Sequence, residues 1–128
     1  MAKYVDGFVL KIPKGKDEEY RKMAEGGRDS WMRHGALGYF ECRGDDMVPP
    51  EMGGERARSF PEMAGAKGDE TVWFSFIIFK SKEHRDEVNA RVMKEMGDMA
   101  AENKNFDMSM PFEMQEMSYG GFQVEVEG

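Results

Sequence analysis

The sequence is short of the residues that cross-link chains or bind metal ions. Its 128 residues include one cysteine, Cys42, and two histidines, His34 and His84. A single thiol forms no disulfide within its chain, and two histidines without thiols or carboxylates at ligand spacing form no metal site. We therefore expect a protein of a reducing compartment, the cytoplasm, with no bound metal. We also predict that Cys42 is buried and inert, as unpaired cysteines commonly are.

Long apolar runs and basic runs are also missing. No stretch approaches the roughly eighteen apolar residues that cross a membrane, and no apolar core follows a basic start as in a secretory signal. Lys and Arg number 18 against 25 Asp and Glu, which gives a net charge of −7. This acidic balance repels a phosphate backbone. No glycine-rich turn between strand and helix is present to bind a phosphate group. We expect no membrane, no nucleic-acid partner and no cofactor.

What the sequence does contain is an alternation of strand and helix patterns. Residues 3–12 and 71–80 are apolar at both parities, which is typical of strands covered on both faces. Residues 36–43 and 122–126 are expected as the remaining strands. Apolar and polar residues alternate in the last of these, as they do in a half-exposed strand.

Two helices are expected between these strands. Residues 16–34 carry apolar side chains at helical spacing, and Gly35 ends the pattern. In residues 82–96 the apolar positions again recur once per helical turn, and Ser81 is a favourable cap for the first turn. Each predicted helix therefore connects two predicted strands.

The order strand, helix, strand, strand, helix, strand predicts an α+β fold. With right-handed crossovers it gives a ferredoxin-like βαββαβ antiparallel sheet, with the first and third strands central and two helices on one face. We expect residues 1–128 to form a single such domain. The stretch at about 44–70 is rich in Gly, Pro and Met, and we expect a long loop there, in which residues 59–62 can start a short helical turn. Because the helices cover only one face of the sheet, we predict a homodimer with two sheets packed face to face.

Short motifs spread over nearly the whole chain identify a family. They are Tyr4-Val5-Asp6-Gly7-Phe8-Val9, His34-Gly35-Ala36-Leu37, Glu41-Cys42, Phe60-Pro61, Phe74-Ser75, residues 81–89, Met110-Pro111-Phe112 and Tyr119-Gly120-Gly121-Phe122. In this order they resemble the YbaA-like family of small bacterial proteins, a domain of unknown function in the dimeric α/β-barrel superfamily. The resemblance implies a dimeric α/β barrel with a small-molecule pocket between the sheet and its helices. Gln115 and Glu116 stand where relatives carry a basic pair, so no anion-binding role is carried over to them.

Asp6 and His34 are the candidate catalytic residues. Asp6 lies on a strand that is otherwise buried, so we expect its carboxylate either to face a pocket or to pair with Arg43 or Arg85. His34 is the candidate general acid or base by residue type. The alternative for His34 is a histidine at a helix end that bonds a backbone carbonyl.

Trp73, Tyr119, His84 and Arg85 are candidates for ligand binding. His84 falls in the first turn of the second helix, where the helix dipole favours a neutral imidazole. Arg85 is alternatively a surface or capping charge, and Tyr119 begins the last strand.

The sequence thus predicts a cytoplasmic homodimer that binds or transforms a small organic molecule in a pocket between sheet and helices. The alternative is a non-catalytic dimeric binding or interaction module in which the same residues are structural. The sequence does not decide whether the protein is an enzyme, and it does not identify a ligand or a pathway.

Overall fold

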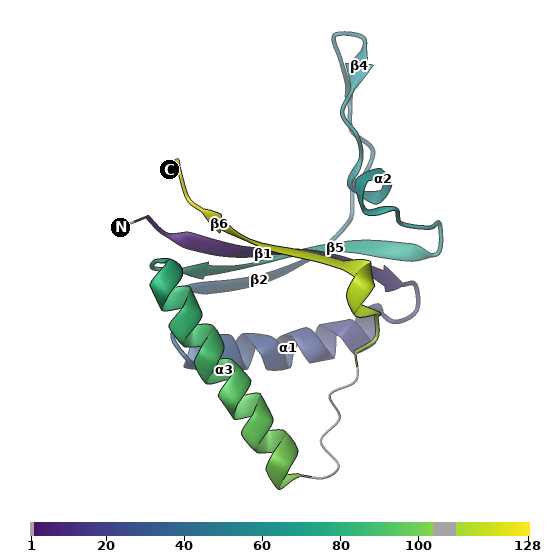
Figure 1. Ribbon diagram of the computed structural model, residues 1–128. Coiled ribbons are helices and arrows are strands. Elements are labelled where there is room, and N and C mark those ends of the chain that lie inside the picture. The colour runs from purple at the N-terminus through teal and green to yellow at the C-terminus, as the bar shows by residue number, and fades with distance from the viewer. Residues whose placement is uncertain (1, 104–109) are drawn as a thin grey trace.

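A computed structural model describes residues 2–103 and 110–128. Figure 1 shows a sheet in the middle, two long helices on one side of it and a narrow projection on the other. In chain order the elements are β1 (Tyr4–Pro13), α1 (Asp17–Arg33), β2 (Gly38–Arg43), β3 (Glu51–Met52), β4 (Glu55–Arg56), α2 (Phe60–Ala64), β5 (Glu70–Phe79), α3 (Lys82–Glu102), the 3-10 helix η1 (Met114–Glu116) and β6 (Met117–Gln123). The predicted α+β fold is confirmed.

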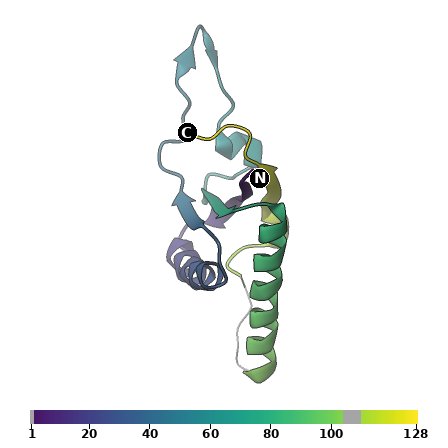
Figure 2. The same ribbon diagram turned by 90° about the vertical axis from the view of Figure 1, so that its left-hand side faces the viewer.

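The main sheet has four antiparallel strands in the order β2-β5-β1-β6. The two strands that were predicted to be central, β1 and β5, are central. They pair along their whole length, from Tyr4 opposite Phe79 to Pro13 opposite Glu70. The helices α1 and α3 lie on the same face of this sheet (Figures 1 and 2).

The core lies between this face and the two helices. Ile12 of β1 and Phe79 of β5 have no exposed surface, and neither do Val88 and Val92 of α3. Burying an aliphatic or aromatic side chain of this size stabilises a fold by roughly 1.5–3 kcal/mol. This layer therefore fixes the helices against the sheet.

The helix ends follow the local sequence signals. Gly35 comes just after α1 with a φ of 112°, a conformation that glycine adopts without strain. At the start of α3 the Ser81 hydroxyl accepts a hydrogen bond from the His84 backbone N–H at 3.1 Å. α3 continues to Glu102, past the predicted end at residue 96. None of the helices in the described ranges is long and apolar enough to cross a membrane.

The last strand begins earlier than its sequence pattern indicated. β6 spans Met117–Gln123. It therefore begins two residues before Tyr119, where the last strand was expected to start, and it ends before most of the alternating residues 122–126. Gly121 pairs with Asp6 of β1, and the Tyr4 side chain occupies the space where a Cβ of Gly121 would be. A glycine permits this close approach, so the strand pairs before the alternation of side chains begins.

The other face of the sheet is covered only by the short helix α2 in the described part of the chain. We call it the open face, and its apolar side chains are Val5, Val9, Phe40, Phe74, Phe76, Ile78 and Phe122. Phe74 is 44% exposed and Phe122 is 62% exposed. Cys42 lies on the same face and is exposed, so the prediction of a buried thiol is wrong. The reason is that β2 is an edge strand with neither α1 nor α3 above this side.

Residues 44–58 form the projection, which we call the arm. It leaves the sheet on the side of the open face (Figures 1 and 2). It carries β3 and β4 and turns at Gly53 and Gly54, whose φ angles are 62° and 82°. The stretch predicted as a long loop therefore contains a small hairpin, followed by the predicted helical turn as α2.

Candidate functional site

Two clusters of polar side chains lie in the layer between the sheet and its helices. The Asp6 cluster consists of Asp6, Arg85, Asn89 and Tyr119. The Glu41 cluster consists of Glu41, Tyr20, Tyr39 and Ser75. Both are built around a carboxylate on a strand, but their partners differ in charge.

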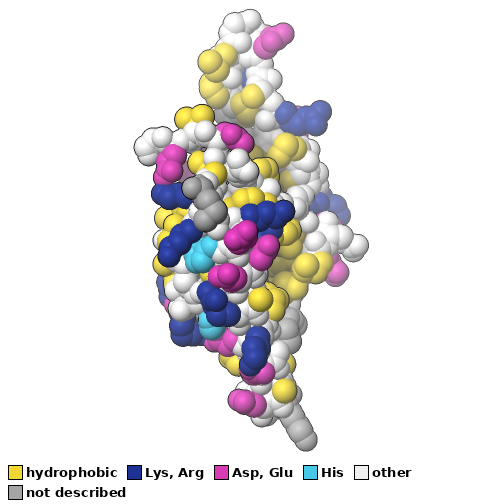
Figure 3. Space-filling model, turned by 60° about the vertical axis from the view of Figure 1, so that its left-hand side comes forward, with side chains coloured by type: hydrophobic (Ala, Val, Ile, Leu, Met, Phe, Trp, Pro, Cys, Tyr) yellow, Lys and Arg dark blue, Asp and Glu magenta, His cyan; other side chains and the backbone are white. Residues whose placement is uncertain are grey.

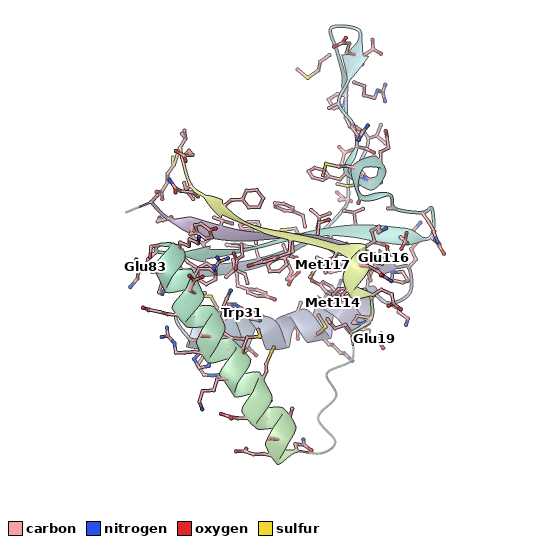
Figure 4. All side chains as sticks on the ribbon, in the orientation of Figure 1. Glu19, Trp31, Glu83, Met114, Glu116 and Met117 are labelled. Carbon is pink, nitrogen blue, oxygen red and sulfur yellow. The ribbon has the colours of Figure 1, made fainter. Side chains whose placement is uncertain are left out.

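Asp6 is 1% exposed and is paired with α3. The Arg85 Nη1 atom donates to Asp6 Oδ1 at 2.6 Å, and the Asn89 amide donates to Oδ2 at 3.3 Å. Asn89 in turn accepts a hydrogen bond from the Trp31 indole N–H at 2.9 Å. Trp31, which is labelled in Figure 4, belongs to α1. The cluster therefore links β1 to both helices, and Arg85 is the partner that the sequence offered as one alternative for Asp6.

Arg85 is also held by three other side chains. Its Nη1 donates to the Tyr119 hydroxyl at 2.9 Å, its Nε donates to Asp86 at 2.7 Å, and its guanidinium lies 4.9 Å from the centre of the Tyr4 ring. Burial alone lowers the pKa of Arg85, but the hydrogen bond to Asp86 and the charge of Asp6 together raise it. The guanidinium therefore stays charged and neutralises the buried carboxylate.

His34 lies apart from the Asp6 cluster. Its Nε2 contacts Glu95 of α3, and its backbone carbonyl accepts a hydrogen bond from Arg91 at 2.9 Å. The hydrogen bond from His34 is the largest influence on Glu95, and with those from Arg33 and Ser30 it lowers the pKa of that carboxyl. His34 thus joins the end of α1 to α3.

Figure 3 shows acidic and basic side chains interspersed over the helix side of the molecule, with no patch of one sign on the face in view.

Of the other candidates, Tyr119 belongs to the Asp6 cluster, whereas His84 and Trp73 have partners outside both clusters. Tyr119 joins Arg85 in the Asp6 cluster and packs on Phe8, with ring centres 4.9 Å apart. His84 is separate: its Nδ1 accepts a hydrogen bond from the Lys80 N–H at 3.0 Å. Trp73 is buried, and its indole N–H donates to Asp17 at 2.8 Å.

Trp73 is one of the residues that line a cleft of about 480 Å³ between α1 and β2. The residues that line it are Arg21, Ala24, Glu25, Arg28, Tyr39, Phe40, Glu41, Arg43 and Trp73. Its volume falls within the range of about 300–1,000 Å³ that small-molecule sites occupy. The cleft thus combines aromatic side chains with several charged ones.

Glu41 is the carboxylate in this cleft with the most hydrogen-bond donors. The Tyr39 hydroxyl donates to Oε1 at 2.8 Å, and the Tyr20 hydroxyl donates to Oε2 at 2.8 Å. The Ser75 hydroxyl also donates to Oε2. Among the described residues, no Lys or Arg nitrogen forms an ion pair with Glu41. Its charge is therefore stabilised by neutral hydroxyl groups.

The two phenols remain protonated because of this environment. Burial raises the pKa of Tyr20 and of Tyr39 well above the ordinary value for tyrosine, and the charge and hydrogen bond of Glu41 raise both further. A phenol that keeps its proton is a fixed hydrogen-bond donor. The cluster therefore holds the Glu41 carboxylate between donors that keep their own protons.

Sequence reasoning missed Glu41 as a site residue, although a signal was present. Tyr39, Glu41 and Arg43 alternate along β2 and share the helix side of the sheet, and the register places Glu41 opposite Ser75. A carboxylate at an inward position of a strand, opposite a small hydroxyl residue, indicates a polar cluster in the core. Tyr20 comes from the apolar face of α1 and has no sequence signal beyond its helical spacing.

Comparison with known proteins places the chain among proteins without an assigned activity. A family model described as a protein of unknown function (DUF1428) matches residues 3–114. The uncharacterized protein YbaA of Escherichia coli strain K12 is 38% identical over 121 residues, which cover 94% of this chain and 95% of the relative. YbaA of Shigella flexneri matches to the same extent. Among solved structures, a de novo designed protein, Foldit4, covers 98% of this chain and 99% of its own at 11% identity, with a TM-score of only 0.40.

Proposed function

This chain belongs to the DUF1428 family of proteins of unknown function, and we propose that it binds a small organic anion in the cleft between α1 and β2. The observation that carries the proposal is Glu41, a carboxylate that accepts hydrogen bonds from three neutral hydroxyl groups in a cleft of ligand size. A carboxylate kept without a cationic partner at the wall of a cleft is available to a bound molecule.

The hydrogen-bond count indicates where a ligand would meet Glu41. Oε2 accepts from two hydroxyls, whereas Oε1 accepts from Tyr39 alone. Since a carboxylate oxygen accepts about two hydrogen bonds, Oε1 has capacity for one further donor. A hydroxyl or amine hydrogen of the ligand fits this position, and proton transfer to Glu41 is the reaction such a contact would support.

The arginines of the cleft favour a ligand with an anionic group. Arg21 is paired with Glu18 and Arg28 with Asp29. Arg43 forms no ion pair with any carboxylate of the described residues. A guanidinium binds carboxylate or phosphate groups through two parallel hydrogen bonds. We therefore assign the anionic end of the ligand to Arg43.

Native mass spectrometry of protein purified gently from its own cells tests the proposal. We expect an extra mass of a few hundred daltons, roughly that of a pocket-sized ligand. The Glu41→Gln variant should lose this mass. Glu25→Gln is the matched control, because Glu25 lines the same cleft and accepts no hydrogen bond from Tyr20, Tyr39 or Ser75. A bare wild-type protein, or a Glu41→Gln variant that keeps the ligand, would contradict the proposal.

We also propose a fold type and a quaternary structure for this protein. The strand order supports a ferredoxin-like arrangement of the four long strands, in which two βα units are interleaved. We propose that two such subunits pack their open faces together as a dimeric α/β barrel in the cytoplasm. Support comes from the exposed aromatic rings of that face, of which Phe40 and Phe76 stack at 4.8 Å.

The second candidate function is a non-catalytic dimeric interaction module. The observation that favours it is the same open face, which is more apolar than a solvated sheet requires. If the protein is such a module, the hydrogen bonds that Glu41 accepts only stabilise the fold. Native mass spectrometry would then give a dimer without bound ligand from both the wild type and Glu41→Gln.

A further inference from the structure

We propose that the arm, residues 44–58, is a clasp that grips the second copy of this chain. The inference rests on the proposed dimer through the open face and adds a second contact to it. Four observations carry it: the direction of the arm, its isolation from its own subunit, its exposed apolar side chains and its reach.

The arm lies on the open-face side of the sheet and extends away from the rest of its own subunit. In Figures 1 and 2 it extends away from the sheet on the side opposite α1 and α3. All residues from 50 to 58 are exposed. Its hairpin contains only two cross-strand pairs, Glu51 with Arg56 and Met52 with Glu55. A two-stranded hairpin without a packed face is marginally stable in water, so this one gains its order from another surface.

The arm also exposes apolar side chains that continue from the open face. Val48 is 70% exposed and Met52 is 75% exposed. At the base of the arm, the Phe60 ring of α2 lies 6.4 Å from the ring of Phe74, and Phe74 lies 5.6 Å from Phe76. An apolar surface therefore runs from the sheet over α2 towards the arm. A partner that covers the open face reaches the arm as well.

The length of the arm fits a second sheet stacked on the first. Nine peptide steps separate residue 44 from residue 53 at the turn, and at roughly 3.3 Å each they span at most about 30 Å. Two packed sheets lie about 10 Å apart. The tip can therefore pass the partner's sheet and reach the level of its helices. Each arm would then hold the flank of the other subunit, as the two-fold symmetry of a dimer requires.

The charges of the tip are compatible with a second copy. Residues 51–58 contain two glutamates and two arginines, which sum to no net charge. The whole chain has a net charge of −7, so an acidic tip would be repelled by an identical partner. A neutral tip with an exposed Met52 avoids that repulsion.

Sedimentation equilibrium of the full chain with a matched pair of variants tests the clasp. Met52→Glu places a charge on the arm, and Met99→Glu places the same charge near the C-terminal end of α3, where Met99 is 43% exposed. This end of α3 lies farthest from the sheet (Figure 1). We expect Met52→Glu to raise the dimer Kd about tenfold or more and Met99→Glu to leave it unchanged. Equal Kd values for both variants would overturn the clasp while leaving the dimer intact. A monomeric wild type would overturn the dimer and the clasp together.

Cross-linking supplies a second measurement that does not depend on a weakened variant. Met52→Cys in a Cys42→Ser background gives a single thiol on the arm, to which a photoreactive benzophenone is attached. Equal amounts of this protein with natural and heavy nitrogen are mixed, exchanged and irradiated. We expect cross-linked peptide pairs of mixed isotope composition, which arise only between subunits. Peptide pairs of uniform isotope composition alone would mean that the arm folds onto its own subunit. The same labelled protein is also irradiated in a cell lysate, where cross-links only to other proteins would assign the arm to an unrelated partner. Either result overturns the clasp.

Discussion

The Asp6→Ala substitution tests whether the Asp6 cluster holds the sheet to α3. The Asp6 side chain is buried and accepts hydrogen bonds from Arg85 at 2.6 Å and from Asn89 at 3.3 Å. Alanine removes both acceptors. Only 14% of the Arg85 side chain is exposed, so water replaces the lost contact poorly.

The size of the effect follows from the burial of this ion pair. Removing one partner of a buried pair destabilises a protein by about 3–5 kcal/mol. We expect the lower value, about 3 kcal/mol, because Arg85 keeps its contacts with Asp86 and Tyr119. For 128 residues at about 2.1 cal/mol/K each, the unfolding entropy is about 0.27 kcal/mol/K, so Tm falls by about 11 °C.

Thermal unfolding followed by circular dichroism measures this fall. All variants are compared at one protein concentration, because the proposed dimer would make Tm depend on concentration. The control is Asp86→Ala, which removes a carboxylate from the same guanidinium but from a side chain that is 61% exposed. We expect the control to lower Tm by no more than about 2 °C, since exposed ion pairs contribute little. Adding Arg85→Met to Asp6→Ala should recover part of the loss, because no unpaired buried charge then remains. Equal Tm values for Asp6→Ala and the control would refute a structural role for Asp6.

Two further predictions concern the Glu41 cluster. The pKa values of Tyr20 and Tyr39 are raised in the folded protein, so the stability they contribute is complete below the unfolded value of about 10 and is lost as the pH rises further. In a spectroscopic titration at about pH 11 we expect at most two of the four tyrosines to ionise while the fold persists. The Glu41→Gln substitution should lower the pKa values of Tyr20 and Tyr39. Ionisation of all four tyrosines in the folded protein would contradict this environment. Neighbouring glycines of α1 give a second comparison, by Tm: Gly26→Ala should stabilise by up to about 1 kcal/mol, since nothing lies within 4 Å of the added Cβ. In Gly27→Ala the added Cβ would lie 2.8 Å from the Tyr39 hydroxyl, so Tyr39 must move from Glu41 and the gain should disappear; equal gains in both variants would argue against this packing.

The fold was largely predictable because its strongest signals are apolar patterns. β1 and β5 are apolar at both parities, and they are the two central strands. Gly35 and Ser81 were sufficient to place the end of α1 and the start of α3. Such signals depend on residues close together in the chain, so they can be recognised without knowledge of the tertiary structure.

The arm and the Glu41 cluster were harder to predict because both depend on distant residues. The strands of the arm are two residues long, which is too short for any alternation to appear. Glu41 meets Tyr20 across 21 positions and Ser75 across 34 positions of the chain. The sequence therefore indicated Asp6, whose burial follows from its own strand. For Glu41 it offered only the alternation along β2, and the register opposite Ser75 that gives this alternation its meaning comes from the tertiary structure. The burial of Cys42 was predicted wrongly for a related reason. Whether a side chain on an edge strand is covered depends on elements that are distant in the chain, and neither α1 nor α3 covers this side of β2.

The contrast between Asp6 and Glu41 is the reason to place the site at the α1–β2 cleft. Both are carboxylates on the helix side of the sheet, and both oxygens of each accept hydrogen bonds. The donor to Asp6 is a guanidinium, so its charge is already neutralised and a bound cation or proton would gain little. The donors to Glu41 are hydroxyls that hold their protons, so its charge remains and the electrostatic attraction for a ligand hydrogen is undiminished. The two carboxylates thus differ in the charge of their donors, and this difference is why we assign the proposed ligand to Glu41.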